Sequence, residues 1–552
     1  MSASYREAAE AWIAQDPDAA TRAELTAILD DETALAERFS SRLQFGTAGL
    51  RGEIGAGPNR MNRVLVGQAA AGFAAWLLAR GGRQSVVIGY DGRTNSDVFA
   101  RDTAELMAGA GVQVTLLPRA LPTPVLAFAV RHLAASAGVM VTASHNPAAD
   151  NGYKVYLGGL DNGAQIVSPV DAEIEASILA VAPVNELPRS NEYLTAGEDV
   201  LAAYVAKTAA LRTTTAPALR FVYTAMHGVG WETAQAVFAA AGLGNPDVVA
   251  EQIEPDATFP TVAFPNPEEE GALDLSFALA RTVKADLIVA NDPDADRLAI
   301  AIPTDDTDGW RRLSGNEVGS LLGWRAAVRL ENEDASATGS ASRRTLAASL
   351  VSSPALAEIA RKYNLDYVET LTGFKWISRA GGLAYGYEEA LGYVVDPAKI
   401  RDKDGISAAV DFLSLAAELR AEGSSIPEHQ RAFDERFGAY ASAQISIRVT
   451  DLTAISSMMA SLRKNPPSAI GESSVSSIDD FRDGFGSFPP SDILRMWIGD
   501  TARVIIRPSG TEPKLKAYID AWSRSGSAVE RRTAADAQVA QLERDLRVML
   551  NG

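Results

Sequence analysis

The sequence predicts a multidomain α/β protein that ends in an α+β module. A chain of 552 residues is too long for one hydrophobic core, so about three or four domains are expected. From about residue 45, short apolar segments alternate with helical stretches, and this pattern restarts twice. Over roughly the last 110 residues the strand patterns instead follow one another and a long helix closes the chain, which indicates an antiparallel sheet.

The expected elements follow from the spacing of apolar residues. Residues 5–40 are rich in Ala, Glu, Leu and Arg at helical spacing, which predicts one or two amphipathic helices before the first domain. In the first α/β run, helices are expected at 66–80 and 98–109. Strands are expected at 85–90, 112–117 and 138–142. The next two runs contain expected strands at 220–224, 286–290, 346–351, 366–371 and 383–387.

The C-terminal part and the connecting segments complete the predicted organisation. Its expected strands are 443–449, 496–498, 503–506 and 514–522, followed by a helix over 528–550. Two segments rich in Ser, Gly, Pro or Asp, 331–344 and 465–490, are predicted to be loops. The predicted domains are 1–205, 206–312, 313–437 and 438–552.

Composition and charge exclude several classes of protein. The 47% apolar and 22% charged residues are typical of a globular protein, and no apolar stretch is long enough to span a membrane. The N-terminus lacks the pattern of a signal peptide, and the absence of cysteine excludes disulfides, zinc-thiolate sites and thiol nucleophiles. We therefore expect a cytoplasmic protein. The net charge of −19 argues against nucleic acid and anionic membranes as partners, and four histidines argue against a histidine-rich metal site.

An acidic segment follows the apolar, strand-like run at 286–291. Asp292, Asp294 and Asp296 stand at alternate positions, so their carboxylates can converge and would repel one another without a cation between them. Carboxylate oxygens suit hard cations such as magnesium, and the adjoining Arg297 is a donor suited to phosphate. The segment therefore predicts a metal and phosphoryl chemistry.

Three other interpretations of the acidic segment fit its sequence less well. An EF-hand fails because Arg297 occupies the position of the required glycine and Pro303 the position of the required glutamate. A phosphatase would use Asp292 as a nucleophile, a role that Asp296 would crowd. A solvated acidic turn would not explain the apolar strand before it.

A polar loop follows the strand expected at 138–142. Its sequence, Thr-Ala-Ser-His-Asn-Pro, places Ser144 at a strand end, where a serine can be a nucleophile. The loop has no Gly-x-Ser-x-Gly elbow, and on its own an Asn-Pro turn is the favoured interpretation. Ten residues on, Lys154 lies on the next strand; near a metal and other cations its pKa is expected to be lowered, which would suit proton exchange.

Three further loops contain residue types suited to a phosphorylated sugar. The segment 507–514, Arg-Pro-Ser-Gly-Thr-Glu-Pro-Lys, offers backbone N–H groups, hydroxyls and a guanidinium for phosphate, although a tight hairpin is an equal alternative. The segment 386–393, Gly-Tyr-Glu-Glu-Ala-Leu-Gly-Tyr, offers acceptors for sugar hydroxyls, with Lys375 close upstream. The glycines around Arg51 in 45–52 indicate backbone packed against a ligand or another loop, or else a flexible connector.

Taken together, these loops resemble those of the α-D-phosphohexomutase superfamily, which includes phosphoglucomutases and phosphomannomutases. The resemblance extends from about residue 40 to the C-terminus, with all four signature loops in the expected order. It implies four domains around a central cleft: three α/β domains with mixed sheets and a C-terminal α+β domain with an antiparallel sheet. The expected substrate is a small phosphosugar, and the chain is expected to be a monomer or homodimer.

The resemblance also implies a role for each matching residue. Ser144 would be the phosphoserine and, with the three aspartates, a ligand of Mg²⁺; a sugar bisphosphate would act as the activator that phosphorylates it. Lys154 matches the proposed general acid/base, and His145 and Arg51 lie in matching catalytic motifs. Contacts to substrate would come from Arg297, Lys375, Glu388, Ala390, Arg507, Ser509, Gly510 and Thr511.

The resemblance predicts interconversion of hexose 1-phosphate and hexose 6-phosphate, with glucose as the first choice and mannose as the second. One departure concerns the sugar loop, where Ala390 replaces a serine found in many family members, so one hydroxyl contact is missing. This form of the loop resembles a branch that also contains phosphopentomutases and sugar-bisphosphate synthases, which remain alternatives. Less favoured alternatives are a phosphatase with an aspartate nucleophile and a non-catalytic sugar-phosphate-binding protein.

Overall fold

A computed structural model describes residues 4–47, 49–304, 309–336, 343–449, 452–509 and 514–551. The chain divides into two compact units. The first unit comprises residues 1–313, 374–379 and 390–418. The second comprises residues 314–373, 380–389 and 419–552.

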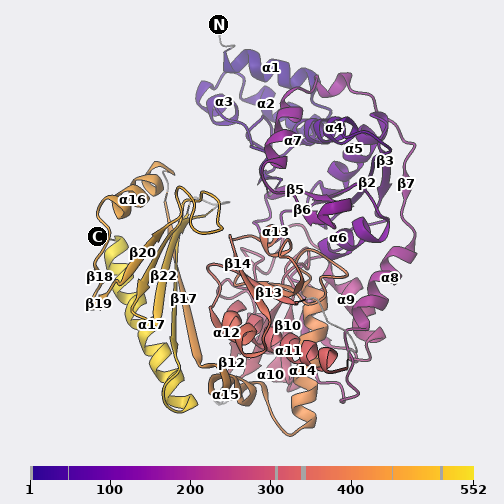
Figure 1. The fold of residues 1–552 in the computed structure, drawn as a ribbon. Helices are drawn as coiled ribbons and strands as arrows, with labels where there is room; N and C mark the ends of the chain where they lie inside the picture. Colours follow the sequence, from indigo (N-terminus) through magenta and orange to yellow (C-terminus); the bar gives the residue numbers. More distant parts are fainter. Residues whose placement is uncertain are drawn as a thin grey trace. The chain divides into compact units, whose positions relative to one another are not determined.

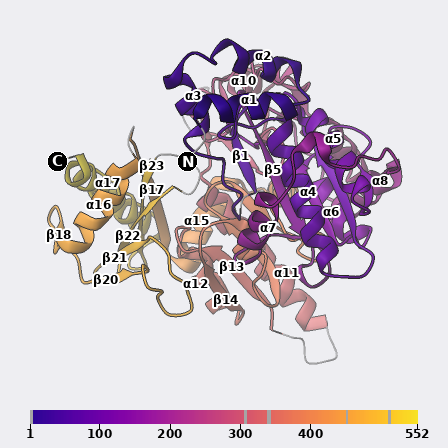
Figure 2. The same cartoon turned by 90° about the horizontal axis from the view of Figure 1, so that it is seen from above.

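Three short helices precede the first sheet, where one or two were predicted. They are α1 (Tyr5–Gln15), α2 (Ala19–Ala27) and α3 (Glu32–Phe39), and they lie together in the indigo part of Figure 2. Each begins at a side chain that accepts a backbone N–H: Ser4, Asp18 and Asp31. Trp12 and Leu25 are buried in their shared apolar cluster.

The first α/β region has a mixed sheet in the order β1-β5-β4-β2-β3-β7, with β6 paired to β5. Its strands are β1 (Leu50–Glu53), β2 (Ser85–Tyr90), β3 (Gln113–Leu116), β4 (Ala137–Val141), β5 (Asp150–Leu157), β6 (Ala164–Gln165) and β7 (Leu194–Thr195). The associated helices are α4 (Arg63–Ala79), α5 (Ser96–Gly109), α6 (Thr123–His132), α7 (Val170–Leu179) and α8 (Glu198–Ala209). β4 is parallel to β2 and antiparallel to β5, so residues 142–149 connect two neighbouring antiparallel strands.

The second α/β region has a mixed sheet in the order β12-β11-β10-β8-β9. Its elements are β8 (Phe221–Thr224), α9 (Gly230–Ala240), β9 (Asp247–Val248), α10 (Asp274–Val283), β10 (Leu287–Ala290), β11 (Ala299–Pro303) and β12 (Trp310–Arg312). β10 is parallel to β8 and antiparallel to β11, so the acidic segment is the connection between β10 and β11.

The third region contributes parallel strands to the second unit, where β13 lies between β14 and β15. Its elements are α11 (Gly315–Ser336), β13 (Thr345–Ser349), α12 (Ala355–Lys362), β14 (Asp366–Thr370), β15 (Leu383–Glu388) and α15 (Ile426–Phe437). The intervening α13 (Phe374–Ile377) and β16 (Gly392–Val394) belong to the first unit, and α14 (Gly405–Ala421) begins there.

The C-terminal region has an antiparallel sheet in the order β17-β23-β22-β21-β20. Its strands are β17 (Ala439–Arg448), β20 (Ser477–Asp480), β21 (Leu494–Ile498), β22 (Ala502–Pro508) and β23 (Lys514–Ser523), with a small ribbon of β18 (Ala469–Ile470) and β19 (Ser473–Ser474). The helices are α16 (Leu452–Lys464) and α17 (Ala528–Asn551). Figure 1 shows α17, in yellow, running along this sheet, and Leu542 and Leu546 are buried in the core between them.

The predicted fold class is confirmed by these sheets, since the α/β regions contain mixed or parallel pairings and the C-terminal sheet is antiparallel. The loop predicted at 465–490 is wrong in part, because it contains β18, β19 and β20. The loop predicted at 331–344 is wrong at its start, where α11 continues to Ser336; residues 337–342 lie outside the described part. None of the described helices is both long and apolar enough to span a bilayer.

Candidate active site

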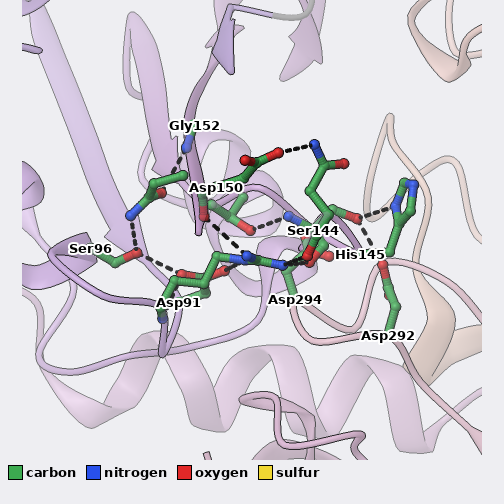
Figure 3. A network of polar contacts seen from close by, with 12 residues as sticks. Asp91, Ser96, Ser144, His145, Asp150, Gly152, Asp292 and Asp294 are labelled. Atoms are coloured by element: carbon green, nitrogen blue, oxygen red, sulfur yellow. Dashed lines mark hydrogen bonds and ion pairs between the residues drawn. The ribbon is translucent and has the colours of Figure 1, made fainter. Parts of the chain in front are cut away.

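Ser144 lies at the carboxyl end of β4 in a backbone conformation that few residues adopt. Its φ is 53°, in the left-handed region, which costs about 1–2 kcal/mol for a residue with a side chain. Its N–H donates to Thr142 Oγ1 at 2.8 Å, and its hydroxyl donates to Asp292 Oδ2 at 2.7 Å (Figure 3). The Nδ1 atom of His145 lies 3.2 Å from the same hydroxyl. The strained turn therefore aims the buried hydroxyl at the acidic segment.

A buried arginine, Arg93, holds this loop from inside. Its Nη2 donates to the carbonyls of Ser144 and Asn146, both at 2.6 Å, and its Nη1 donates to those of Pro147 and Asp150 at 2.8 and 3.0 Å. Because four loop carbonyls point inward at one guanidinium, the loop has little freedom to rearrange.

The turn between β10 and β11 buries all three aspartates completely or almost so. Asp292 and Asp294 are 0% exposed and Asp296 is 1% exposed, and a carboxylate oxygen of each lies within 4.8 Å of the others. Ala295 adopts φ 55°, which tightens the turn. Gly228 packs on this turn, where an added Cβ would lie 2.2 Å from the Cα of Pro293, so only glycine fits.

Two lysines partly balance the three carboxylates. Lys154, on β5, has its Nζ 2.7 Å from Asp294 Oδ2 and 3.0 Å from Asp296 Oδ2. Lys403 has its Nζ 3.1 Å from the same Asp296 oxygen. Burial lowers the pKa of Lys154, but the attraction of Asp294 and Asp296 outweighs burial and raises it overall. The lowered pKa expected for Lys154 beside a bound metal stays a prediction.

The remaining carboxylate oxygens fit a hard cation. Asp294 Oδ1 and Asp296 Oδ1 are buried and have no hydrogen-bond partner among the described residues. Burial, together with repulsion from Asp294 and Asp296, raises the pKa of Asp292 well above its usual range. Mg²⁺ is bound by carboxylate oxygens, and here two of these oxygens are buried without a partner and lie close to a third carboxylate that they repel. The three aspartates therefore fit the metal.

The other residues predicted for the site in the first unit contact the Ser144 loop, the acidic segment or the glycine-rich segment. Arg51 Nη1 donates to Asn146 Oδ1 at 3.2 Å, and Lys375, on α13, donates to the hydroxyl of Thr47. The Nε of Arg297 lies 3.8 Å from Asp292 Oδ2, and its backbone N–H donates to Asp292 Oδ1 at 3.0 Å. Burial, with the charges of Arg297 and Arg51, lowers the pKa of His145 well below its ordinary value, so its ring is neutral.

The glycine-rich segment around Arg51 packs against another strand, as one of its two interpretations predicted. β1 pairs with β5 from Leu50↔Tyr153 to Glu53↔Asp150. Gly49 has φ +75°, and an added Cβ would lie 1.7 Å from the carbonyl oxygen of Tyr153. The flexible-connector interpretation is therefore wrong for the described residues of this segment.

The second unit contains the predicted sugar and phosphate loops. Glu388 ends β15, and its neighbour Glu389 accepts hydrogen bonds from Ser349 and Ser352 at 2.9 and 3.1 Å. Arg507 lies near the end of β22. In the phosphate loop, Ser509 is described, whereas Gly510 and Thr511 lie outside the described residues. The sugar loop is divided between the units: residues 386–389 belong to the second unit, and Ala390 belongs to the first.

Comparisons with known proteins agree with this arrangement. Three domain models match: phosphoglucomutase/phosphomannomutase alpha/beta/alpha domain I at residues 42–184, domain II at 201–305 and domain III at 315–433. A Haemophilus influenzae protein named "Probable phosphomannomutase" is 53% identical over 473 residues, which cover 85% of this chain and 95% of that protein.

This chain belongs to the phosphoglucomutase/phosphomannomutase family, within the α-D-phosphohexomutase superfamily. It is thus a mutase, an isomerase that transfers phosphate intramolecularly. A human protein named phosphopentomutase is 36% identical over 544 residues, covering 89% of this chain and 86% of that protein. A solved structure of a phosphoglucomutase/phosphomannomutase family protein from Burkholderia thailandensis has the same fold, with a TM-score of 0.69, 20% identity, and coverage of 92% and 97% of the two chains.

Two residues of this mutase escaped prediction from the sequence. Arg93 stands in a Tyr-Asp-Gly-Arg segment after β2, and Lys403 in an Asp-Lys-Asp-Gly segment before α14. In both segments opposite charges and a glycine adjoin an apolar element, a signal that could have marked a buried ion pair. The glycine of the second segment has a steric role: an added Cβ on Gly405 would lie 2.1 Å from the carbonyl oxygen of Arg297.

Proposed function

We propose that the enzyme interconverts a hexose 1-phosphate and a hexose 6-phosphate through a phosphoserine at Ser144, with glucose phosphates preferred and mannose phosphates second. The observation that carries the proposal is the 2.7 Å hydrogen bond from the Ser144 hydroxyl to the buried Asp292. A nucleophilic serine and an acidic cluster that fits a divalent cation share one water-poor site, which is what transfer of a highly charged phosphoryl group requires.

In the proposed reaction, a free hydroxyl oxygen of the sugar phosphate attacks the phosphorus on Ser144. A new P–O bond to the sugar forms, and the bond to Ser144 Oγ breaks. The attacking hydroxyl loses its proton, and the departing Ser144 oxygen gains one. Lys154, charged beside its aspartates, is suited to donate the proton that the Ser144 oxygen gains and then to recover the proton lost by the attacking hydroxyl. The neutral His145, 3.2 Å from Ser144 Oγ, is suited to accept the Ser144 proton in the return step.

The bisphosphorylated sugar then reorients in the site, so that its other phosphate is returned to Ser144. The same sugar bisphosphate would phosphorylate a bare Ser144, and so activate the enzyme. Asp292, Asp294 and Asp296, with an oxygen on Ser144, would hold Mg²⁺, which when bound neutralises phosphate charge. Arg93 and Asp292 keep the Ser144 loop and its hydroxyl in one orientation throughout the cycle.

Recognition of the sugar hydroxyls and of the phosphate that is not transferred would come from residues of the second unit. Glu388 would accept hydrogen bonds from ring hydroxyls, and the segment 507–511 would hold the phosphate that is not transferred. Arg297 and Lys375 would add positive charge near the phosphosugar, with Arg51 beside the Ser144 loop. Ala390, which lacks a hydroxyl, leaves one side of the sugar without a hydrogen bond.

A pentose phosphate is the second candidate substrate, because a relative named phosphopentomutase is 36% identical over most of both chains. A sugar-bisphosphate synthase is a further alternative. A phosphatase that uses Asp292 is less favoured, because Asp292 already accepts the Ser144 hydroxyl and the N–H of Arg297.

The test is a panel of glucose, mannose, glucosamine and ribose phosphates, assayed for isomerisation with magnesium and then with a chelator. We expect isomerisation of glucose phosphates to be fastest and to stop when the metal is removed. If the enzyme instead released inorganic phosphate without isomerising the sugar, and the Ser144→Ala variant kept this activity, the protein would be a phosphatase. Faster turnover of ribose phosphate would move the proposal to a pentose.

A further inference from the structure

The strand that leads into the predicted phosphate loop contains a second, buried arginine. Arg503 precedes Arg507 by four residues on β22, and residues four apart on a strand face the same side of the sheet. Arg503 is 2% exposed and is one of the largest fully buried side chains. A guanidinium is buried to this depth only where its partners compensate for the loss of water.

The partners of Arg503 come from two different sheets. Its Nε donates to Asp520 Oδ2 at 2.9 Å, on the neighbouring strand β23. Its Nη1 donates to Glu369 Oε1 at 3.1 Å, on β14, and its Nη2 donates to the carbonyl of Ser352 at 2.5 Å, in the turn after β13. Burial lowers the pKa of Arg503, but Asp520 and Glu369 outweigh burial and raise it, so the side chain stays charged.

The turn that Arg503 contacts also holds the sugar loop. The hydroxyls of Ser349 and Ser352 donate to Glu389 Oε2, and the Ser352 hydroxyl accepts the backbone N–H of Glu389 at 3.1 Å. Glu389 directly follows Glu388, the predicted acceptor of sugar hydroxyls. One residue, Ser352, therefore joins Arg503 to the sugar loop.

Other contacts make this junction rigid. Ile505, which lies between Arg503 and Arg507 on the same face, packs in an apolar cluster with Leu350 and Val351 of the turn. Ser442 Oγ donates to Asp520 at 2.7 Å and accepts a hydrogen bond from the side-chain amide of Asn316. The side-chain oxygen of Asn316 in turn accepts the backbone N–H of Ser353, the residue after Ser352. Polar and apolar contacts thus fix β22 against the turn on both sides of Arg503.

We propose that Arg503 is a positioning residue that sets the spacing between Glu388 and Arg507, and through this spacing selects the length of the phosphosugar. This inference rests on the proposed function and deepens it. Hexose 6-phosphates and pentose 5-phosphates differ by one carbon in the span from the C3 hydroxyl to the phosphate, and a misplacement of about 1 Å can cost about 10²-fold in rate. A spacing fixed by a buried ion pair can therefore discriminate between them.

The test compares Arg503→Lys with a matched control, Arg495→Lys. Arg495 is also buried and donates to Glu369, at 2.8 Å, but its other partner is Asp479 rather than the Ser352 turn. We would measure kcat and KM for glucose 6-phosphate and ribose 5-phosphate, along with the thermal midpoint. For Arg503→Lys we expect KM for the preferred sugar to rise roughly 10- to 100-fold and the ratio of the two kcat/KM values to change at least about fivefold. Arg495→Lys should change that ratio less than about twofold.

Ser352→Ala provides a second variant without any change of charge. It keeps the carbonyl that Arg503 contacts but removes the hydroxyl that holds Glu389, so the ratio should change in the same direction. Equal ratios in Arg503→Lys, Ser352→Ala and Arg495→Lys, with only the thermal midpoint altered, would overturn the spacing role and leave the mutase reaction standing. A wild-type enzyme that isomerises neither sugar would overturn the proposed function itself.

Discussion

The two units differ in how firmly they hold the residues proposed to act on substrate. In the first unit Ser144 and the three aspartates are at most 3% exposed, and most of their polar atoms are bonded. In the second unit Glu388, Arg507 and Ser509 are half-buried at the ends of strands, and the support lies behind them, in Arg503 and Ser352.

This difference matches two different physical tasks. Transfer of a phosphoryl group needs fixed charges and little water, because reorganisation during the reaction would add to the barrier. In the proposed cycle the sugar binds in two orientations, with one or the other of its phosphate-bearing ends held by the enzyme. Its recognition therefore needs a surface that accepts the ring hydroxyls in both orientations. We therefore expect changes in the first unit to affect kcat and changes in the second to affect KM.

The largest effect should come from Ser144→Ala, which removes the nucleophile of the first unit. Turnover should fall by about 10⁴-fold or more, because no neighbouring group can form the same ester. Isomerisation of glucose 1-phosphate measures this, with Ser177→Ala on α7 as a control that should retain wild-type kcat. Near-normal activity of Ser144→Ala would refute the nucleophile.

A second large effect should come from Arg93→Met, which leaves four loop carbonyls and Asp91 without the guanidinium. We expect kcat to fall by about 10²–10³-fold and stability to fall by about 3–5 kcal/mol, because buried polar groups lose their partner. Steady-state kinetics and urea unfolding measure the two effects. The control is Arg119→Met, whose ion pairs to Glu198 and Glu232 are more exposed and should contribute little. Equal losses in both variants would contradict a specific role for Arg93.

Glu388→Gln should affect recognition and not the phosphoserine. Replacing a charged acceptor by a neutral one should raise KM about 10-fold, with kcat changed less than about threefold. Initial rates over a range of glucose 1-phosphate concentrations give both constants. If kcat fell while KM stayed constant, the assignment of sugar-hydroxyl recognition to Glu388 would be wrong.

The smallest expected effect concerns stability in the second unit. The ring of His429 on α15 stacks on Trp324 of α11, with centroids 4.3 Å apart, and burial, with the charge of Arg325, lowers its pKa to about 4. A lowered histidine pKa gives stability that is complete above about pH 6.5 and is lost as the pH falls toward 4, because only the unfolded state gains the proton. At pH 5 the loss should be about 1–2 kcal/mol, after allowance for partial exposure.

The measurement is hydrogen exchange of peptides from α11 and α15 at pH 7.5 and pH 5, after correction for intrinsic rates. His429→Phe keeps an aromatic ring on Trp324 and removes the titration, so its local stability should change less between the two pH values. The same change in both proteins would show that His429 is not the group responsible.

Much of the site could be predicted because its residues stand in short segments at strand ends. Ser144 and Asp292 follow β4 and β10, whose apolar runs are evident in the sequence, and the resemblance to the phosphohexomutases implied that the two residues share one site. The partners of Arg93 and Arg503 could not be predicted, because they are carbonyls and carboxylates that are distant in the sequence. The rise in the pKa of Lys154 could not be predicted, because its pairing with Asp294 and Asp296 is a tertiary contact. The strands β18 to β20 were missed because a few residues rich in Ser and Gly give no period.

The most direct test of the central claim is the location of phosphate on the protein. The enzyme would be incubated with glucose 1,6-bisphosphate and magnesium, and its peptides would be mapped by mass spectrometry before and after addition of glucose 1-phosphate. We expect one phosphate, on Ser144, that is lost from the protein when the monophosphate is added. An active enzyme with phosphate on another residue and Ser144 bare would contradict the account.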